Sequence, residues 1–241
     1  MNIFLLYVFL FFIGSLFGWV LELFYRRPIE GRWMNPGFLT GPYLPIYGFG
    51  LCTLYSIAAI GSRLTLGSLP VQILTVFAVS GVLMTLIELI AGKIFIIGFK
   101  VKLWDYTNEF CNYKGIICLK FSLIWAALGT VYYFFVNPYI TDAILWFTEH
   151  LAFSFVLGIF FGVFMIDVVY SCNIIIKIRE CAKKNDLLVR YEELKLSVRT
   201  AEENYREKGR RLRAFIFSSL QIHNHLDAYK ERLRSLKNKG N

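Results

Sequence analysis

Three acidic residues lie inside or at the ends of long apolar stretches of the sequence, namely Glu22, Glu88 and Asp167. An ionisable group within hydrocarbon is costly, so it usually faces a charged partner or a wet cavity. One interpretation is local pairing at headgroup depth: Glu22 with Arg26, Glu88 with Lys93 or a facing helix, and Asp167 with lysines of the tail. The alternative is that the three acids converge on a site that binds a cation or a proton, or that receives a basic partner.

A segment rich in proline and glycine follows the first of these acids. Residues 35–50, "NPGFLTGPYLPIYGFG", contain four glycines, three prolines and no charge. Prolines remove backbone donors and glycines weaken a helix, so we expect helix only from about Ile46 onward. Irregular backbone at membrane depth persists only where protein or water satisfies its polar groups. The segment is therefore either a loop at the inner headgroups or a re-entrant element that lines a cavity near Glu22. Its candidate site residues are Asn35, Gly37, Gly41, Pro42, Pro45 and Tyr47.

Two further stretches, "RWMNPGF" and "KLWDYTNEFCNYKG", mix aromatic rings with charged and amide side chains. Such rings are typical of the aromatic belt at the membrane–water interface. A second interpretation is that Trp104 and Asp105, together with Glu109 and Asn112, contact an ATPase subunit or a polar substrate.

Enzyme signatures are absent from the sequence. It contains no phosphate-binding P-loop, no HExxH, no GxSxG and no Cys/His metal spacing. The five cysteines are scattered without a CxxC pair, so we interpret them as structural. We therefore predict no catalytic residue, no metal and no cofactor. The acids leave open one enzymatic alternative, an intramembrane enzyme that acts on a lipid-type substrate.

The elements that position these residues are membrane spans. The chain is 56% hydrophobic and 17% aromatic with a mean hydropathy of +0.53, which indicates an all-α integral membrane protein. About 20 helical residues cross a hydrocarbon core of about 30 Å. The first span lacks a basic leader and a cleavage site, which favours an uncleaved span. The five predicted spans are roughly 3–24, 43–61, 69–91, 116–136 and 151–176.

The distribution of charge predicts the orientation. Lys and Arg follow the first, third and fifth spans, whereas only Arg63 lies on the other face, so the N-terminus lies outside and the C-terminus in the cytoplasm. Residues 173–241 carry 17 Lys and Arg against 9 Asp and Glu, a net charge of +8 out of +9. We expect this tail to bind anionic lipid headgroups of the cell membrane, and not nucleic acid, because no nucleic-acid-reading motif accompanies the charge.

The chain thus divides into a transmembrane domain, 1–176, and a basic helical tail, 177–241. Between Leu187 and Leu236, apolar residues recur at alternating spacings of four and three residues. Only Lys208 and Ser219 interrupt this pattern. This repeat is typical of a coiled coil, formed between chains or by a hairpin at Gly209. The tail would then form homo- or hetero-oligomers. The alternative is an amphipathic helix on the membrane surface.

A weak internal similarity suggests a duplication. The first span ends "GWVLELFYR" and the third ends "TLIELIAGK", and an aromatic, amide-containing segment follows each. Because both spans run inward, the arrangement would be a parallel repeat, as occurs among transporters.

The chain resembles the bacterial family of type IV ABC-transporter permeases over roughly residues 5–175. The resemblance lies in segment 18–50 and in the stretches "LIELIAGKIF" and "LWDYTNEFCNYKGIICLKFSLIWAALG". The resemblance implies a permease subunit that works with a separate ATPase. The alternative function is a membrane-anchored scaffold or sensor that assembles partners through the tail.

Overall fold

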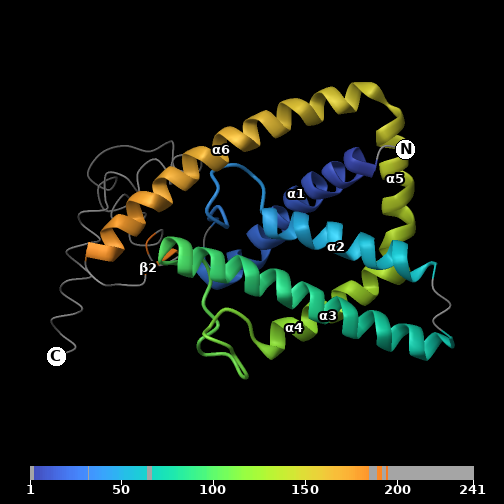
Figure 1. Ribbon diagram of the computed structural model, residues 1–241, viewed down its shortest axis with the longest axis horizontal. Coiled ribbons are helices and arrows are strands. Elements are labelled where there is room, and N and C mark those ends of the chain that lie inside the picture. The colour runs from blue at the N-terminus through green and yellow to red at the C-terminus, as the bar shows by residue number, and fades with distance from the viewer. Residues whose placement is uncertain (1–2, 32, 64–66, 185–188, 192–193, 195–241) are drawn as a thin grey trace. The chain divides into compact units, whose positions relative to one another are not determined.

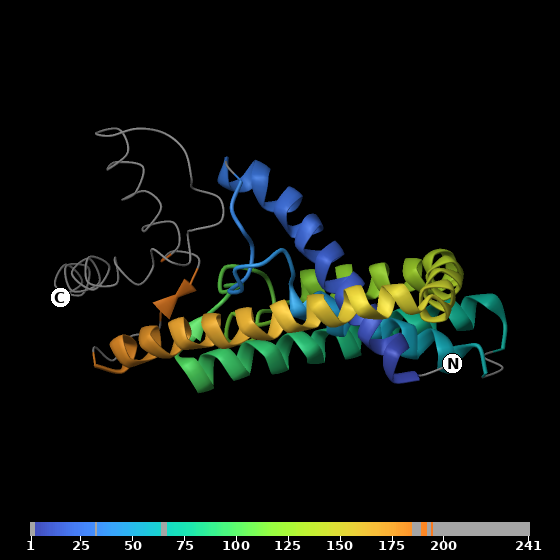
Figure 2. The ribbon, with the colours of Figure 1, turned by 90° about the horizontal axis from the view of Figure 1, so that it is seen from above.

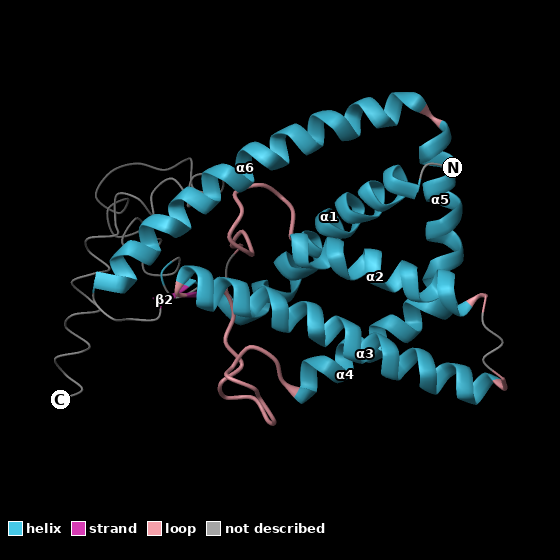
Figure 3. Cartoon of the chain, in the orientation of Figure 1, coloured by secondary structure: helices cyan, strands magenta, loops and turns pink. Residues whose placement is uncertain are grey.

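The computed structural model describes residues 3–31, 33–63, 67–184, 189–191 and 194 of the chain. It is mostly helical, which confirms the predicted class, and the long segments without helix follow α1 and β1 (Figure 3). The elements in order are α1 (Ile3–Glu30), α2 (Pro45–Gly61), α3 (Leu69–Lys93), the π-helix η1 (Ile94–Phe99), β1 (Val101–Lys102), α4 (Leu119–Val131), the π-helix η2 (Tyr132–Val136), α5 (Asn137–Glu149), α6 (Leu151–Lys184) and β2 (Val189–Arg190).

Four of the described helical segments are long and apolar enough to cross a membrane: Ile3–Pro28, Leu69–Phe99, Leu119–Ala143 and Ala152–Ile176. They confirm that the chain has the character of a membrane protein. The remaining predicted span corresponds to α2, a shorter apolar helix of 17 residues. At 1.5 Å per residue it is about 26 Å long, against about 30 Å of hydrocarbon.

Four helices extend beyond the ends of their predicted spans: α1 to Glu30, α6 to Lys184, and two that continue through further helical segments. α3 continues into η1, which stops at Lys100, a residue in the left-handed conformation with φ 58°. The helix expected to end at Val136 continues through η2 and α5, because Pro138 lies in the first turn of α5, where its missing N–H is not needed. The chain then turns at His150, so that α5 and α6 run at an angle to each other (Figure 2).

The chain forms two compact units. The first comprises Met1–Pro36, Gly41–Ala91 and Tyr106–Met165, and the second comprises Gly37–Thr40, Gly92–Asp105 and Ile166–Asn241. The short segment 37–40 thus belongs to a different unit from its neighbours in sequence.

In the first unit, α1 and α2 run antiparallel and side by side (Figure 1). Small residues allow their close approach: a methyl group at Gly48 would overlap Ser15 and the backbone oxygen of Phe11. Ser15 is fully buried. Farther along the pair, the hydroxyls of Tyr7 and Ser56 are hydrogen-bonded at 2.8 Å. Close backbone contact through small residues is a common way for membrane helices to associate.

The pair of α3 and α4 packs in the same way. A methyl group at Gly129 would overlap the buried Ser80, and Gly81 lies against Ala126. The Thr85 hydroxyl donates to the Ser122 hydroxyl at 2.8 Å. The duplication hypothesis predicts such a similarity between the two pairs.

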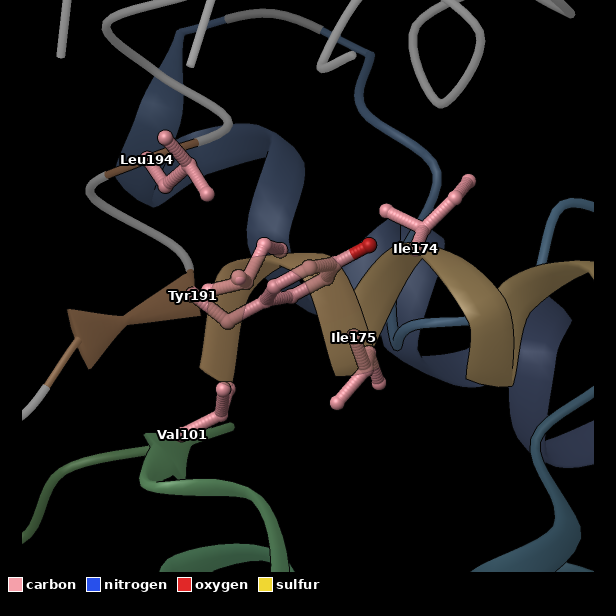
Figure 4. Close-up of a cluster of buried hydrophobic side chains, with 6 residues drawn as sticks. Val101, Ile174, Ile175, Tyr191 and Leu194 are labelled. Carbon is pink, nitrogen blue, oxygen red and sulfur yellow. The ribbon is translucent and has the colours of Figure 1, made fainter. Parts of the chain in front are cut away.

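The second unit has its own apolar core, which joins β1, α6 and the residues after β2 (Figure 4). β1 and β2 pair in parallel, Val101 with Val189 and Lys102 with Arg190. The core consists of Val101, Ile174, Ile175, Ile178, Tyr191 and Leu194.

This core bears on the predicted coiled coil. Tyr191 and Leu194 are two of the heptad positions, and they are 1% and 0% exposed within the chain's own core. Within the stretch that carries the heptad pattern, Val189 and Arg190 are extended and pair with β1. The heptads of residues 195–236 and the proposed bend at Gly209 lie outside the described residues, so the coiled coil stays a prediction.

Candidate functional site

The proline- and glycine-rich segment folds back along α1. Asn35 Oδ1 accepts a hydrogen bond from the Trp19 indole, and the Leu44 backbone N–H donates to the Ser15 carbonyl at 2.9 Å. Ser15 lies near the middle of the span Ile3–Pro28. α1 continues for about 22 Å beyond Ser15 to its end, at 1.5 Å per residue. The irregular chain therefore returns to the middle of α1 before α2 begins.

Protein covers this irregular backbone. Met34, Tyr43 and Leu44 are 2–8% exposed. The Tyr43 ring packs edge-on against Phe160 and Phe164, with ring centroids 5.6 and 5.2 Å away. Such cover is the condition under which irregular backbone persists at membrane depth.

The start of α2 places Tyr47 beside Glu22. Pro45 opens the helix, one residue before the predicted start. Tyr47 then donates its phenol hydrogen to Glu22 Oε2 at 2.8 Å, while Arg26 Nε donates to Glu22 Oε1 at 2.8 Å. The predicted pairing of Glu22 with Arg26 is confirmed. Gly18 makes room for the Tyr47 ring, because a methyl group there would overlap it.

Glu88 forms a similar pair with the loop before α4. Tyr106 donates its phenol hydrogen to Glu88 Oε1 at 2.9 Å, and Glu88 is only 4% exposed. Tyr106 stacks on Phe121 at 4.6 Å, and its backbone N–H donates to the Gly115 carbonyl. Burial and the Glu88 charge raise the pKa of Tyr106, so its phenol stays protonated and acts as a donor. The expected partner Lys93 has an exposed side chain.

The second oxygen of Glu88 accepts no hydrogen bond of acceptable geometry among the described residues. Glu88 Oε2 and Trp125 Nε1 are both buried, and neither makes a hydrogen bond of acceptable geometry within the described part of the chain. The Trp125 indole nevertheless lies close enough to Glu88 to act on its carboxylate.

The two carboxylate–tyrosine pairs belong to one group of side chains. The centroids of the Tyr47 and Trp125 rings are 5.7 Å apart. The charges of Glu88 and Glu22 both contribute to the raised pKa of Tyr106. We call this group the polar cluster, and it consists of Glu22, Arg26, Tyr47, Glu88, Tyr106 and Trp125. It draws on α1, α2, α3, α4 and the loop that precedes α4.

Asp167 lies in the second unit and anchors the segment 37–40. Its Oδ1 accepts from the Thr40 backbone N–H at 3.1 Å and from the Ser171 hydroxyl at 2.9 Å. The Phe38 carbonyl accepts from the Tyr191 hydroxyl at 3.4 Å. The third predicted acid therefore has a defined structural role in holding a loop.

Asp105 ties the two short strands together. Its Oδ1 accepts from Lys102 Nζ at 2.6 Å and its Oδ2 from Arg190 Nη2 at 3.0 Å. Trp104 is half-buried beside it. Both residues belong to the second unit.

The remaining candidates shape the backbone. Gly37 has φ 74°, a conformation that favours glycine, and Gly41 makes room for the Tyr43 ring. Pro42 is exposed.

Tyr106 and Trp125 were not predicted as site residues. Tyr106 occurs in an aromatic loop that resembles an interfacial belt, and Trp125 lies in an apolar helix. The sequence signal that could have identified Tyr106 is its position directly after Asp105, which was a predicted site residue.

A model of the family described as "Putative ABC-transporter type IV" matches residues 9–172. The chain belongs to this family. The match contains every residue of the polar cluster, and Asp167 as well. Comparison with curated proteins and with solved structures found no match to the chain.

Proposed function

We propose that this ABC-transporter-family chain is the membrane-spanning permease subunit of a transporter, without enzymatic activity of its own, and that a separate subunit hydrolyses ATP for it. The supporting observation is the polar cluster, in which the buried Glu88 and five half-buried ionisable and aromatic side chains gather at long apolar helices, and irregular backbone lies alongside α1. Ionisable groups at such positions mark substrate or ion pathways in membrane proteins.

The second span supports the proposal further. In the proposed topology, with five spans and an outer N-terminus, α2 runs from about Ser15 toward the start of α1 and, at about 26 Å, is shorter than the hydrocarbon core of about 30 Å. Residues 33–44 complete this span without helix. Broken spans of this kind form the substrate sites of many transporters, because they expose backbone groups and helix ends at membrane depth.

A cysteine scan tests this broken span. Single cysteines from Gly41 to Tyr47 are labelled with a bulky impermeant reagent from the cytoplasmic side of membrane vesicles. We expect protection to increase from Pro42, which is exposed, to Tyr43 and Leu44, which are 2% and 8% exposed. Uniform labelling of all positions would identify a surface loop instead.

Affinity purification of the tagged chain from its native membranes tests the permease assignment. We expect a protein with a P-loop to co-purify in stoichiometric amount. Stoichiometric partners without any ATPase would favour the scaffold function.

A further inference from the structure

The two carboxylates of the polar cluster, Glu22 and Glu88, differ in the hydrogen bonds and the opposite charge that they receive. Both oxygens of Glu22 accept hydrogen bonds, one from the cation Arg26 and one from Tyr47. Glu88 receives one hydrogen bond from the neutral phenol of Tyr106, and its other oxygen is left without one among the described residues.

Among the described residues, the charges of the polar cluster do not balance. Tyr106 and Trp125 lie beside Glu88, and Tyr47 lies near both Glu88 and the Glu22–Arg26 pair. The cation of this set, Arg26, is hydrogen-bonded to Glu22. If both carboxylates are ionised, the cluster retains one uncompensated negative charge. A buried charge without a partner is costly, and the group commonly becomes neutral instead.

A proton is the simplest ligand that removes this charge. A metal cation requires several oxygen ligands, but both tyrosine hydroxyls direct their hydrogens at carboxylates. Within the described ranges no three His, Cys, Asp or Glu side chains are grouped as metal ligands. A proton needs only the free oxygen.

We propose that Glu88 is a proton-binding residue, whose Oε2 forms an O–H bond with a proton taken from water and returns that proton to water when the pH rises. Tyr106 holds Oε1 in both states, and the Trp125 indole lies beside the carboxyl. In the ionised state the Trp125 N–H can turn to Oε2 as a donor. The inference does not depend on transport, since proton binding is a property of the chain alone.

Infrared spectroscopy of the purified full-length chain tests the proposal. The detergent must lack ester groups, because ester carbonyls absorb near the protonated carboxyl band. At about pH 6.5, roughly two units above the ordinary pKa of Asp and Glu, exposed carboxyls are ionised. We expect a residual protonated carboxyl band at this pH that disappears by about pH 9, at least four units above the ordinary values.

Variants assign the band. Glu88→Gln should abolish it, whereas Glu109→Gln, which alters an exposed ion pair with Lys120, should leave it unchanged. Tyr106→Phe removes a donor that favours the ionised carboxylate, so the band should persist to a pH about one to two units higher. This third variant keeps the test informative if Glu88→Gln does not fold.

Three results would overturn the proposal: no band in the wild-type protein at about pH 6.5, an equal band in Glu88→Gln, or a band that pH 9 does not remove.

Discussion

Substitution of Gly48 by alanine tests the close contact between α1 and α2. An added methyl group would overlap both the Ser15 hydroxyl and the Phe11 backbone oxygen. The hydroxyl can rotate away, but the backbone oxygen cannot, so the two helices must separate. Forcing an extra methyl group into a well-packed contact costs about 1–3 kcal/mol.

Gly162 provides the matched control. It lies within α6, and an added methyl group there would meet no atom within 4 Å. In a helix, alanine is favoured over glycine by about 0.5–1 kcal/mol. Gly48 lies in α2 and shares this gain, so the packing cost of about 1–3 kcal/mol is the expected difference between the variants, with position 48 destabilised and position 162 stabilised.

The assay is the free energy of unfolding in mixed micelles, determined by titration with a denaturing detergent and followed by circular dichroism. The sign of the change is decisive. If Gly48→Ala stabilises the protein as much as Gly162→Ala does, the described approach of α1 and α2 is wrong.

Three further predictions follow from single contacts. Tyr47→Phe should lower the free energy of unfolding by about 1.5–3 kcal/mol, because Glu22 loses a charge-assisted hydrogen bond, whereas the exposed Tyr25→Phe should change it little; equal effects would refute the contact. Asp167→Ala should cost about 1–3 kcal/mol in the same assay, and Asp167→Asn, which keeps the Oδ1 acceptor, should recover part of that loss; no recovery would show that the acceptor is unimportant. Truncation after Leu194 should preserve the thermal stability of the chain, whereas truncation after residue 183 should lower it, because the core then lacks Tyr191 and Leu194. If truncation after Leu194 abolishes oligomers, that result would support assembly through the tail.

The sequence predicted the features that depend on local spacing. Uncharged runs predicted the long helices, and the spacing of Glu22 and Arg26 predicted their ion pair. The prolines predicted the start of α2 to within one residue. Each of these features involves residues within about one helical turn, or an uninterrupted run, so no tertiary information is needed.

Contacts between distant elements were not predictable in this way. The donor to Glu88 is Tyr106, 18 residues later, and the partner of Asp167 is the Thr40 backbone, 127 residues earlier. The heptad pattern likewise gives no information on contacts such as the pairing of Val189 with Val101. Tyr191 and Leu194 occupy heptad positions, but in this structure they pack against apolar side chains of α6 and β1.

The central claim is that the polar cluster belongs to a permease that works with an ATPase, and ATP hydrolysis by the purified assembly tests it most directly. Rates are compared in lipid nanodiscs for the wild type, for Glu22→Gln with Arg26→Gln, and for Asp142→Asn. Asp142 is an exposed carboxylate of α5 outside the polar cluster, so it is the control. We expect hydrolysis by the wild type, a change of at least about fivefold in the cluster variant, and little change in the control, since coupling free energies of 1–3 kcal/mol are typical. No hydrolysis by the wild-type assembly, or equal rates in the wild type and the cluster variant, would contradict the claim.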